Sequence, residues 1–173
     1  MIHQRIVEIA KSFIGMQEIP GNMGFKDERF QELMIETGWQ KGQAWCSYFA
    51  ELVWKIAYQE INPEFIPKLD KLFAAGAVKT FQNFKDACIF PVDKKPEPGA
   101  VAIWQTWKDN QPFWTGHAGI VISITGPNEI ATVEGNTNSK GGREGIEVAE
   151  KRRRLSFDVT NGLCLKGFIH PIS

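Results

Sequence analysis

The sequence predicts an α+β fold in which helices occupy the first half of the chain and strands the second. In the first half, apolar residues recur at spacings of three and four, which is typical of amphipathic helices. After about residue 98 the pattern changes to short apolar runs separated by turns that contain glycine or proline. This segregation favours N-terminal helices packed on one face of a central antiparallel sheet.

Two amphipathic helices are predicted before residue 40. Apolar side chains at helical spacing run from Ile2 to Phe13, and Gly15 closes this first segment. Asp27 can cap a second helix that runs through Phe30 to Ile35, and Gly38 ends it.

The next helix, residues 46–58, differs from these two because it is apolar on nearly every side. A helix with this pattern is expected in the centre of a domain. Ser47, Glu51 and Lys55 form its only polar stripe, and a glutamate four residues before a lysine favours an ion pair. A further helix is predicted over 74–84.

The second half of the chain predicts a set of short strands. A hairpin is expected where the turn Gly126-Pro127-Asn128 joins residues 117–125 to residues 129–134. Two segments are predicted as loops: 105–116, which is polar although it carries aromatic residues, and 136–145, which is rich in Asn, Ser and Gly. The expected strands are residues 101–104, 117–125, 129–134, 146–152 and 164–169.

Length and composition predict one soluble domain that spans residues 1–173. The 173 residues are 43% hydrophobic and 23% charged, with a formal net charge of zero, so nothing global favours nucleic acid as a partner. No apolar stretch approaches a membrane span, and the N-terminus lacks the pattern of a signal peptide. The chain is therefore expected to be made in the cytoplasm.

The cysteines and the one dense charge run are less informative. Three widely spaced cysteines, Cys46, Cys88 and Cys164, form neither a disulfide framework nor a zinc-binding pattern. The run 151–154 is Lys-Arg-Arg-Arg. It indicates either a solvated strand end or, less commonly, contact with an anionic substrate.

Cys46 is the first candidate for chemistry because it opens the buried helix. A helix N-terminus carries partial positive charge and free N–H groups, and both favour the thiolate. The competing interpretation is a buried structural cysteine, which is the commoner environment for a free thiol.

His117, Glu134 and Asn136 are the other candidates. His117 begins a predicted strand between Gly116 and Gly119, which leave room for close approach. If Thr125 pairs with Glu129, the hairpin places His117 opposite residue 137, so Glu134 to Asn136 lie near it within the register error. A carboxylate or amide oxygen there can accept the ring N–H and orient the base.

At these residues the chain resembles the CHAP family of cysteine- and histidine-dependent amidohydrolases/peptidases, within the papain-like clan. The resemblance covers about residues 5–168, and its four segments follow the family's order. One departure is Ala100, where many relatives carry an acidic residue. The similar segments are Trp45-Cys46-Ser47-Tyr48-Phe49, Pro98-Gly99-Ala100-Val101-Ala102-Ile103-Trp104, Gly116-His117-Ala118-Gly119-Ile120-Val121 and Glu134-Gly135-Asn136.

The resemblance implies a papain-like fold and a peptidoglycan hydrolase, either an N-acetylmuramoyl-L-alanine amidase or a peptide endopeptidase. It implies Cys46 as nucleophile, His117 as base, Glu134 as orienter and Asn136 as support. Some relatives bind calcium through an acidic loop, but this sequence has no such loop, so no metal or other cofactor is expected.

The resemblance also bears on the oxyanion donor and on the groove. Papain relatives place a glutamine about six residues before the cysteine, which makes Gln40 a candidate donor, with Gln43 the alternative. Aromatic side chains near the site either wall a substrate groove or fill the core. These are Trp45, Trp107, Phe113 and Trp114.

The expected partners follow from the same resemblance. We expect a monomer that acts on peptidoglycan or another peptide amide and reaches the cell wall by lysis or through a secretion system. An inhibitor or immunity protein is the other partner considered. Two alternatives remain open: an isopeptidase or acyltransferase acting on intracellular protein amides, and a catalytically idle binding module.

Overall fold

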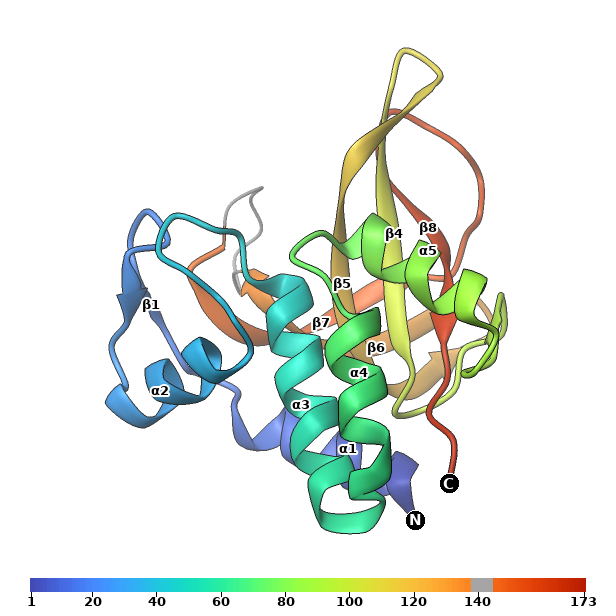
Figure 1. The fold of residues 1–173 in the computed structure, drawn as a ribbon. Helices are drawn as coiled ribbons and strands as arrows, with labels where there is room; N and C mark the ends of the chain where they lie inside the picture. Colours follow the sequence, from blue (N-terminus) through green and yellow to red (C-terminus); the bar gives the residue numbers. More distant parts are fainter. Residues whose placement is uncertain (138–144) are drawn as a thin grey trace.

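The computed structural model describes residues 1–137 and 145–173 and confirms the α+β architecture (Figure 1). The helices are α1 (Ile2–Ser12), α2 (Glu28–Glu36), α3 (Cys46–Ile61), the 3₁₀ turn η1 (Pro63–Phe65), α4 (Ile66–Leu72) and α5 (Ala77–Ala87). The strands are β1 (Glu18–Ile19), β2 (Gly24–Phe25), β3 (Val92–Asp93), β4 (Val101–Lys108), β5 (Gln111–Gly126), β6 (Glu129–Thr137), β7 (Glu147–Arg154) and β8 (Gly162–Ile169).

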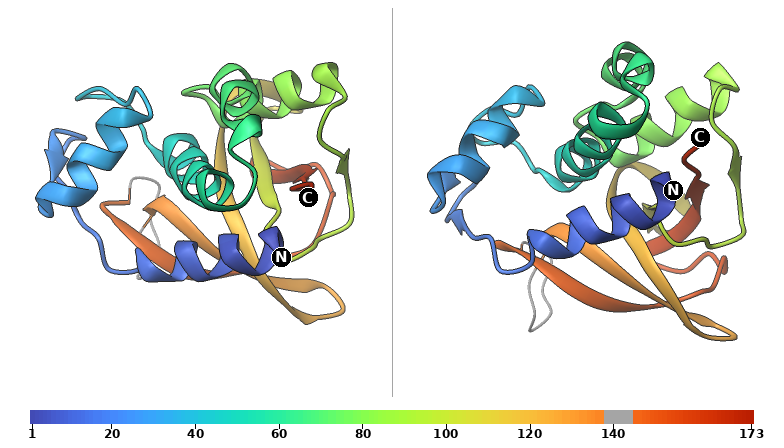
Figure 2. Two further views of the ribbon diagram at one scale, coloured as in Figure 1. Left: turned by 60° about the horizontal axis from the view of Figure 1, so that its bottom comes forward. Right: turned by 90° about the horizontal axis from the view of Figure 1, so that it is seen from below.

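The main sheet has six strands in the order β3-β8-β4-β5-β6-β7, and every pairing in it is antiparallel. The helices lie on one side of this sheet, with α3 between α1 and α4 (Figures 1 and 2). Helix α3 contacts β5 and β6, the two strands that carry the candidate base and its orienter. The helix and the sheet therefore meet where the site was expected.

The core explains why α3 is apolar on nearly all sides. Trp54 and Phe49 of α3 are fully buried between the sheet and the other helices. A smaller apolar cluster on the opposite face of the sheet contains Trp104 and Phe168, and Leu155 and Phe157 pack over it. Each face of the central strands is thus covered, and the N-terminus of α3 is anchored in the largest apolar cluster.

Local signals account for the predicted helices. Asp27 caps α2 by accepting a hydrogen bond of 2.7 Å from the Phe30 N–H, as expected. The sequence missed α4 because Pro63 and Pro67 resemble helix breakers, although Pro67 lies in the first turn of α4, where proline is tolerated.

The predicted loop over 105–116 is wrong. Strands β4 and β5 continue through this region as a long hairpin, closed by Asp109 and Asn110. Both turn residues have positive φ, 52° and 60°, which is the backbone of a two-residue hairpin turn. The polar composition reflects an exposed hairpin rather than an irregular loop.

The second predicted loop, 136–145, is wrong at its start because β6 runs to Thr137, and residues 138–144 lie outside the described part of the chain. The predicted β5–β6 register is also slightly wrong: Gly126, not Thr125, pairs with Glu129. Two irregularities then shift the ladder so that Ile120 pairs with Val133. The shift brings Glu134 beside Gly119.

Within the described residues, no helix is long and apolar enough to cross a membrane.

Candidate active site

Cys46 is the first residue of α3 and is buried, with 6% of its surface exposed. Burial raises the pKa of its thiol, but attraction and a hydrogen bond to His117, together with hydrogen bonds from the Ala118 and Ser47 backbone N–H groups, lower it overall. The structure therefore favours a thiolate at this position, as the helix start predicted.

His117 on β5 lies between this sulfur and a carboxylate. Its Nε2 is 2.8 Å from Glu134 Oε2, which leaves Nδ1 for Cys46. Burial lowers the pKa of the ring, but attraction and hydrogen bonding to Cys46 and then to Glu134 outweigh burial and raise it well above its ordinary value. An imidazolium–thiolate pair is the charge state that these contacts favour.

Glu134 on β6 is fully buried and accepts four hydrogen bonds. Besides His117, Thr132 Oγ1 donates to Oε1 at 2.6 Å, and Arg153 donates through Nε to Oε1 at 2.7 Å and through Nη2 to Oε2 at 2.5 Å. Burial raises the pKa of this carboxyl, but the hydrogen bonds and charges of Arg153 and His117 hold it far below its usual range. Glu134 is therefore ionised.

The glycines around His117 make room for protein atoms rather than for a ligand. A Cβ on Gly119 would lie 2.6 Å from Glu134 Cγ, and a Cβ on Gly116 would lie 2.1 Å from the Trp104 carbonyl oxygen. Both glycines are thus needed for the close packing of β5 against its neighbours.

A cleft of about 900 Å³ opens onto Cys46 and His117. Asn136 also lines this cleft, in a left-handed conformation with φ of 53°, and within the described residues no hydrogen bond joins it to His117. The four predicted site residues are therefore gathered at one place, and it is Glu134 that contacts the histidine. The described lining also includes Ala44, Thr106, Trp107, Lys108, Asp109, Phe113, Thr115, Gly116, Asn161, Gly162 and Leu163.

The two glutamine candidates do not belong to the described lining of the cleft. Gln40 is exposed, and the side-chain oxygen of Gln43 accepts hydrogen bonds from the Gln40 N–H and the Tyr48 hydroxyl. Neither glutamine therefore lies in the described lining, and a side-chain oxyanion donor at Gln40 or Gln43 stays a prediction.

The aromatic candidates separate into two groups. Trp45 is fully buried and donates to Glu18 Oε2 at 2.5 Å, so it belongs to the core. Trp107 and Phe113 line the cleft, and Trp114 is 81% exposed on the same hairpin.

Sequence reasoning missed Arg153. The run 151–154 was interpreted as one unit, yet strand alternation divides it: Arg152 is exposed and pairs with Glu129, whereas Arg153 points to Glu134. The period-two pattern of a strand divides the run into two faces, but it does not identify which cation faces Glu134.

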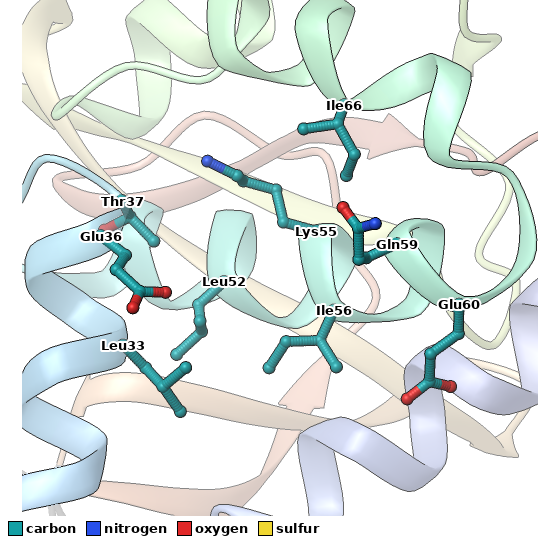
Figure 3. Close-up of a pocket in the computed structure, with 9 residues that line it drawn as sticks. All are labelled: Leu33, Glu36, Thr37, Leu52, Lys55, Ile56, Gln59, Glu60 and Ile66. Atoms are coloured by element: carbon teal, nitrogen blue, oxygen red, sulfur yellow. The ribbon is translucent and has the colours of Figure 1, made fainter.

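A second groove, of about 410 Å³, lies between α2, α3 and α4 (Figure 3). Leu33, Leu52 and Ile56 gather on its floor. It is lined by Leu33, Glu36, Thr37, Leu52, Lys55, Ile56, Gln59, Glu60 and Ile66. None of these residues carries a thiol or an imidazole.

The part of the chain that the structure describes contains no cluster of three or more His, Cys, Asp or Glu side chains placed to hold a metal ion.

The comparisons with known proteins give a family match. No curated protein matches the chain. The CHAP domain matches residues 38–136, more than half of the 173 residues, and this segment contains Cys46, His117 and Glu134. The chain belongs to the CHAP domain family.

Proposed function

We propose that this protein is a peptidoglycan hydrolase, formed as one catalytic domain by residues 1–173, that cleaves amide bonds through a cysteine acyl-enzyme. Family membership supports the coarser activity of a cysteine- and histidine-dependent amidohydrolase/peptidase. The observation that carries the proposal is the continuous contact from Cys46 through His117 to an ionised Glu134 at a cleft.

In the first step the Cys46 thiolate attacks the amide carbonyl carbon, forming a C–S bond and an oxyanion. The free N–H of Cys46 at the start of α3 is the proposed backbone donor to that oxyanion. His117 then transfers its proton to the leaving amine as the C–N bond breaks. Asn136, which lines the cleft, supports the substrate or the oxyanion.

In the second step the thioester is hydrolysed. Neutral His117 takes a proton from water, and the resulting hydroxide attacks the thioester carbonyl. The C–S bond breaks, releasing a carboxylic acid and restoring the imidazolium–thiolate pair. Glu134 holds the ring in position through both steps.

Incubating wild type and Cys46→Ala with peptidoglycan from several bacteria, followed by mass spectrometry of the soluble products, tests this proposal. Only wild type should release muropeptides, and their masses will distinguish an amidase from an endopeptidase. Release by Cys46→Ala at the wild-type rate would refute the mechanism. Absence of release from every wall, with Cys46 still labelled by a thiol reagent, would refute the substrate and favour intracellular protein amides.

A further inference from the structure

Arg153 is the last member of the chain of contacts that begins at Cys46. Its Nε and Nη2 atoms each donate to a different oxygen of Glu134, which is the two-pronged geometry that a guanidinium forms with a carboxylate. Its guanidinium also lies over the Trp104 ring, 5.4 Å from the centroid, and this ring is 5.9 Å from the His117 ring. Arg153 is therefore fixed by two independent contacts beside the site.

The charges of the four groups alternate: thiolate, imidazolium, carboxylate, guanidinium. Cys46 on α3 faces His117 on β5. Glu134 is faced by His117 from β5 and by Arg153 from β7, and among the described residues His117 and Arg153 are the charges that act on Glu134. Without Arg153, a buried carboxylate would have one cationic partner, which it would share with the thiolate.

We propose that Arg153 is a positioning residue: it keeps the Glu134 carboxylate ionised and fixed in orientation, and thereby holds His117 in line with Cys46. This inference rests on the proposed roles of Cys46 and His117 but not on the peptidoglycan substrate. The Glu134 oxygen that accepts from His117 also accepts from Arg153, so any movement of the arginine displaces the partner of the base.

The test is the pH dependence of Cys46 alkylation by iodoacetamide, read as the mass of the Cys46 peptide so that Cys88 does not contribute. In Arg153→Met the site loses one positive charge and Glu134 is no longer fixed, so His117 moves out of line with Cys46 and the imidazolium stabilises the thiolate less. The acid limb of the alkylation profile should therefore move up by about one pH unit. Amide hydrolysis near neutral pH should fall by about ten- to a hundredfold in kcat, with KM little changed.

Arg152→Met is the matched control, because it removes the same charge from the next position of β7, where the side chain pairs with Glu129 instead. Its alkylation profile should superimpose on that of wild type. Arg153→Lys keeps the charge but loses the two-pronged contact, so its acid limb should lie between those of wild type and Arg153→Met.

A double variant covers the case in which Arg153→Met alone fails to fold. Glu134→Gln with Arg153→Met removes both members of this ion pair, and if the arginine acts through Glu134 the double variant should be no slower than Glu134→Gln alone. A folded Arg153→Met with the wild-type profile, or an additive loss in the double variant, would overturn the inference. If wild-type Cys46 reacts only as an ordinary thiol, it is the proposed catalytic pair that fails.

Discussion

Two buried glutamates of this protein, Glu134 and Glu51, have opposite electrostatic environments. Glu134 is fully buried and receives four hydrogen bonds from three side chains, two of them cationic. Glu51 on α3 is 5% exposed, and its ion-pair partner Lys55 lies 3.7 Å away. Lys55 is held more closely by Asp70, at 2.6 Å.

The pKa values of the two carboxyls consequently move in opposite directions. Burial raises the pKa of Glu51 to about 7, since Lys55 only partly compensates and Asp70 adds repulsion. The pKa of Glu134 is lowered despite deeper burial, because Arg153 and His117 outweigh it. Burial alone therefore does not decide ionisation. The number and charge of the hydrogen-bond donors around a carboxyl decide whether it is ionised. A shifted carboxyl pKa is therefore not by itself a sign of catalysis.

Among variants at the two glutamates and their contacts, the largest effect is expected from Glu134→Gln, which removes the carboxylate while keeping its size. His117 loses its anionic partner and Arg153 is left without its counter-ion, so stability should fall by about 3–5 kcal/mol. Activity should also fall, by about a hundredfold, which is less than the complete loss expected for Cys46→Ala. Urea unfolding and amide hydrolysis on the same preparations measure the two effects.

Asn136→Ala is the control for this assignment, because Asn136 lines the same cleft but, among the described residues, forms no hydrogen bond with His117. We expect it to retain more activity than Glu134→Gln. A silent Glu134→Gln combined with an inactive Asn136→Ala would move the orienting role to Asn136.

A smaller and oppositely signed effect is expected from Glu51→Gln. The folded-state pKa of Glu51, about 7, lies above its ordinary value of 4.5. Between these pH values the folded state keeps a proton that the unfolded state releases. Wild-type stability should therefore decline from pH 4.5 to 7 by up to about 3 kcal/mol. Glu51→Gln lacks this decline, so its free energy of unfolding should increase relative to that of wild type as pH rises. Its activity should be unchanged.

Urea unfolding at pH 5, 6, 7 and 8 measures that gain. Glu36→Gln, at an exposed position on α2, removes an equal charge and should show no comparable pH-dependent difference. A Glu51→Gln difference that stays constant over the four pH values would show that the lysine fully compensates the buried carboxylate.

The parts of the site that depend on neighbours close in the sequence could be predicted, whereas those that depend on distant strand pairing could not. The position of Cys46 at a helix start could be predicted because helix periodicity is a local pattern, and the Glu51–Lys55 ion pair could be predicted for the same reason. The proximity of His117 to Glu134 was found because one short turn fixes their register to within a few residues.

Arg153 could not be found in this way, because a long segment separates β6 from β7. The pairing of Ile130 with Arg153 depends on the whole sheet, so the sequence does not indicate which of four consecutive cations faces Glu134. The hairpin at Asp109-Asn110 was missed for a different reason, since this dipeptide lacks the glycine that usually marks such a turn.

Thr132→Val should give the smallest effect and completes the comparison between the two glutamates. Its buried hydroxyl donates a hydrogen bond of 2.6 Å to Glu134 Oε1, an oxygen that also accepts a hydrogen bond from Arg153 Nε. Removing one of four donors should lower stability by about 1 kcal/mol and activity by less than about tenfold.

The pH dependence separates this variant from Glu51→Gln. Because Glu134 stays ionised with three donors, the stability lost in Thr132→Val should be constant from pH 5 to 8, whereas the gain in Glu51→Gln should grow over that range. A Thr132→Val loss that grows or shrinks across this range would mean that three donors do not keep Glu134 charged. The carboxylate would then depend on all four donors acting together, and Thr132 would rank with Arg153 in holding His117 in line with Cys46.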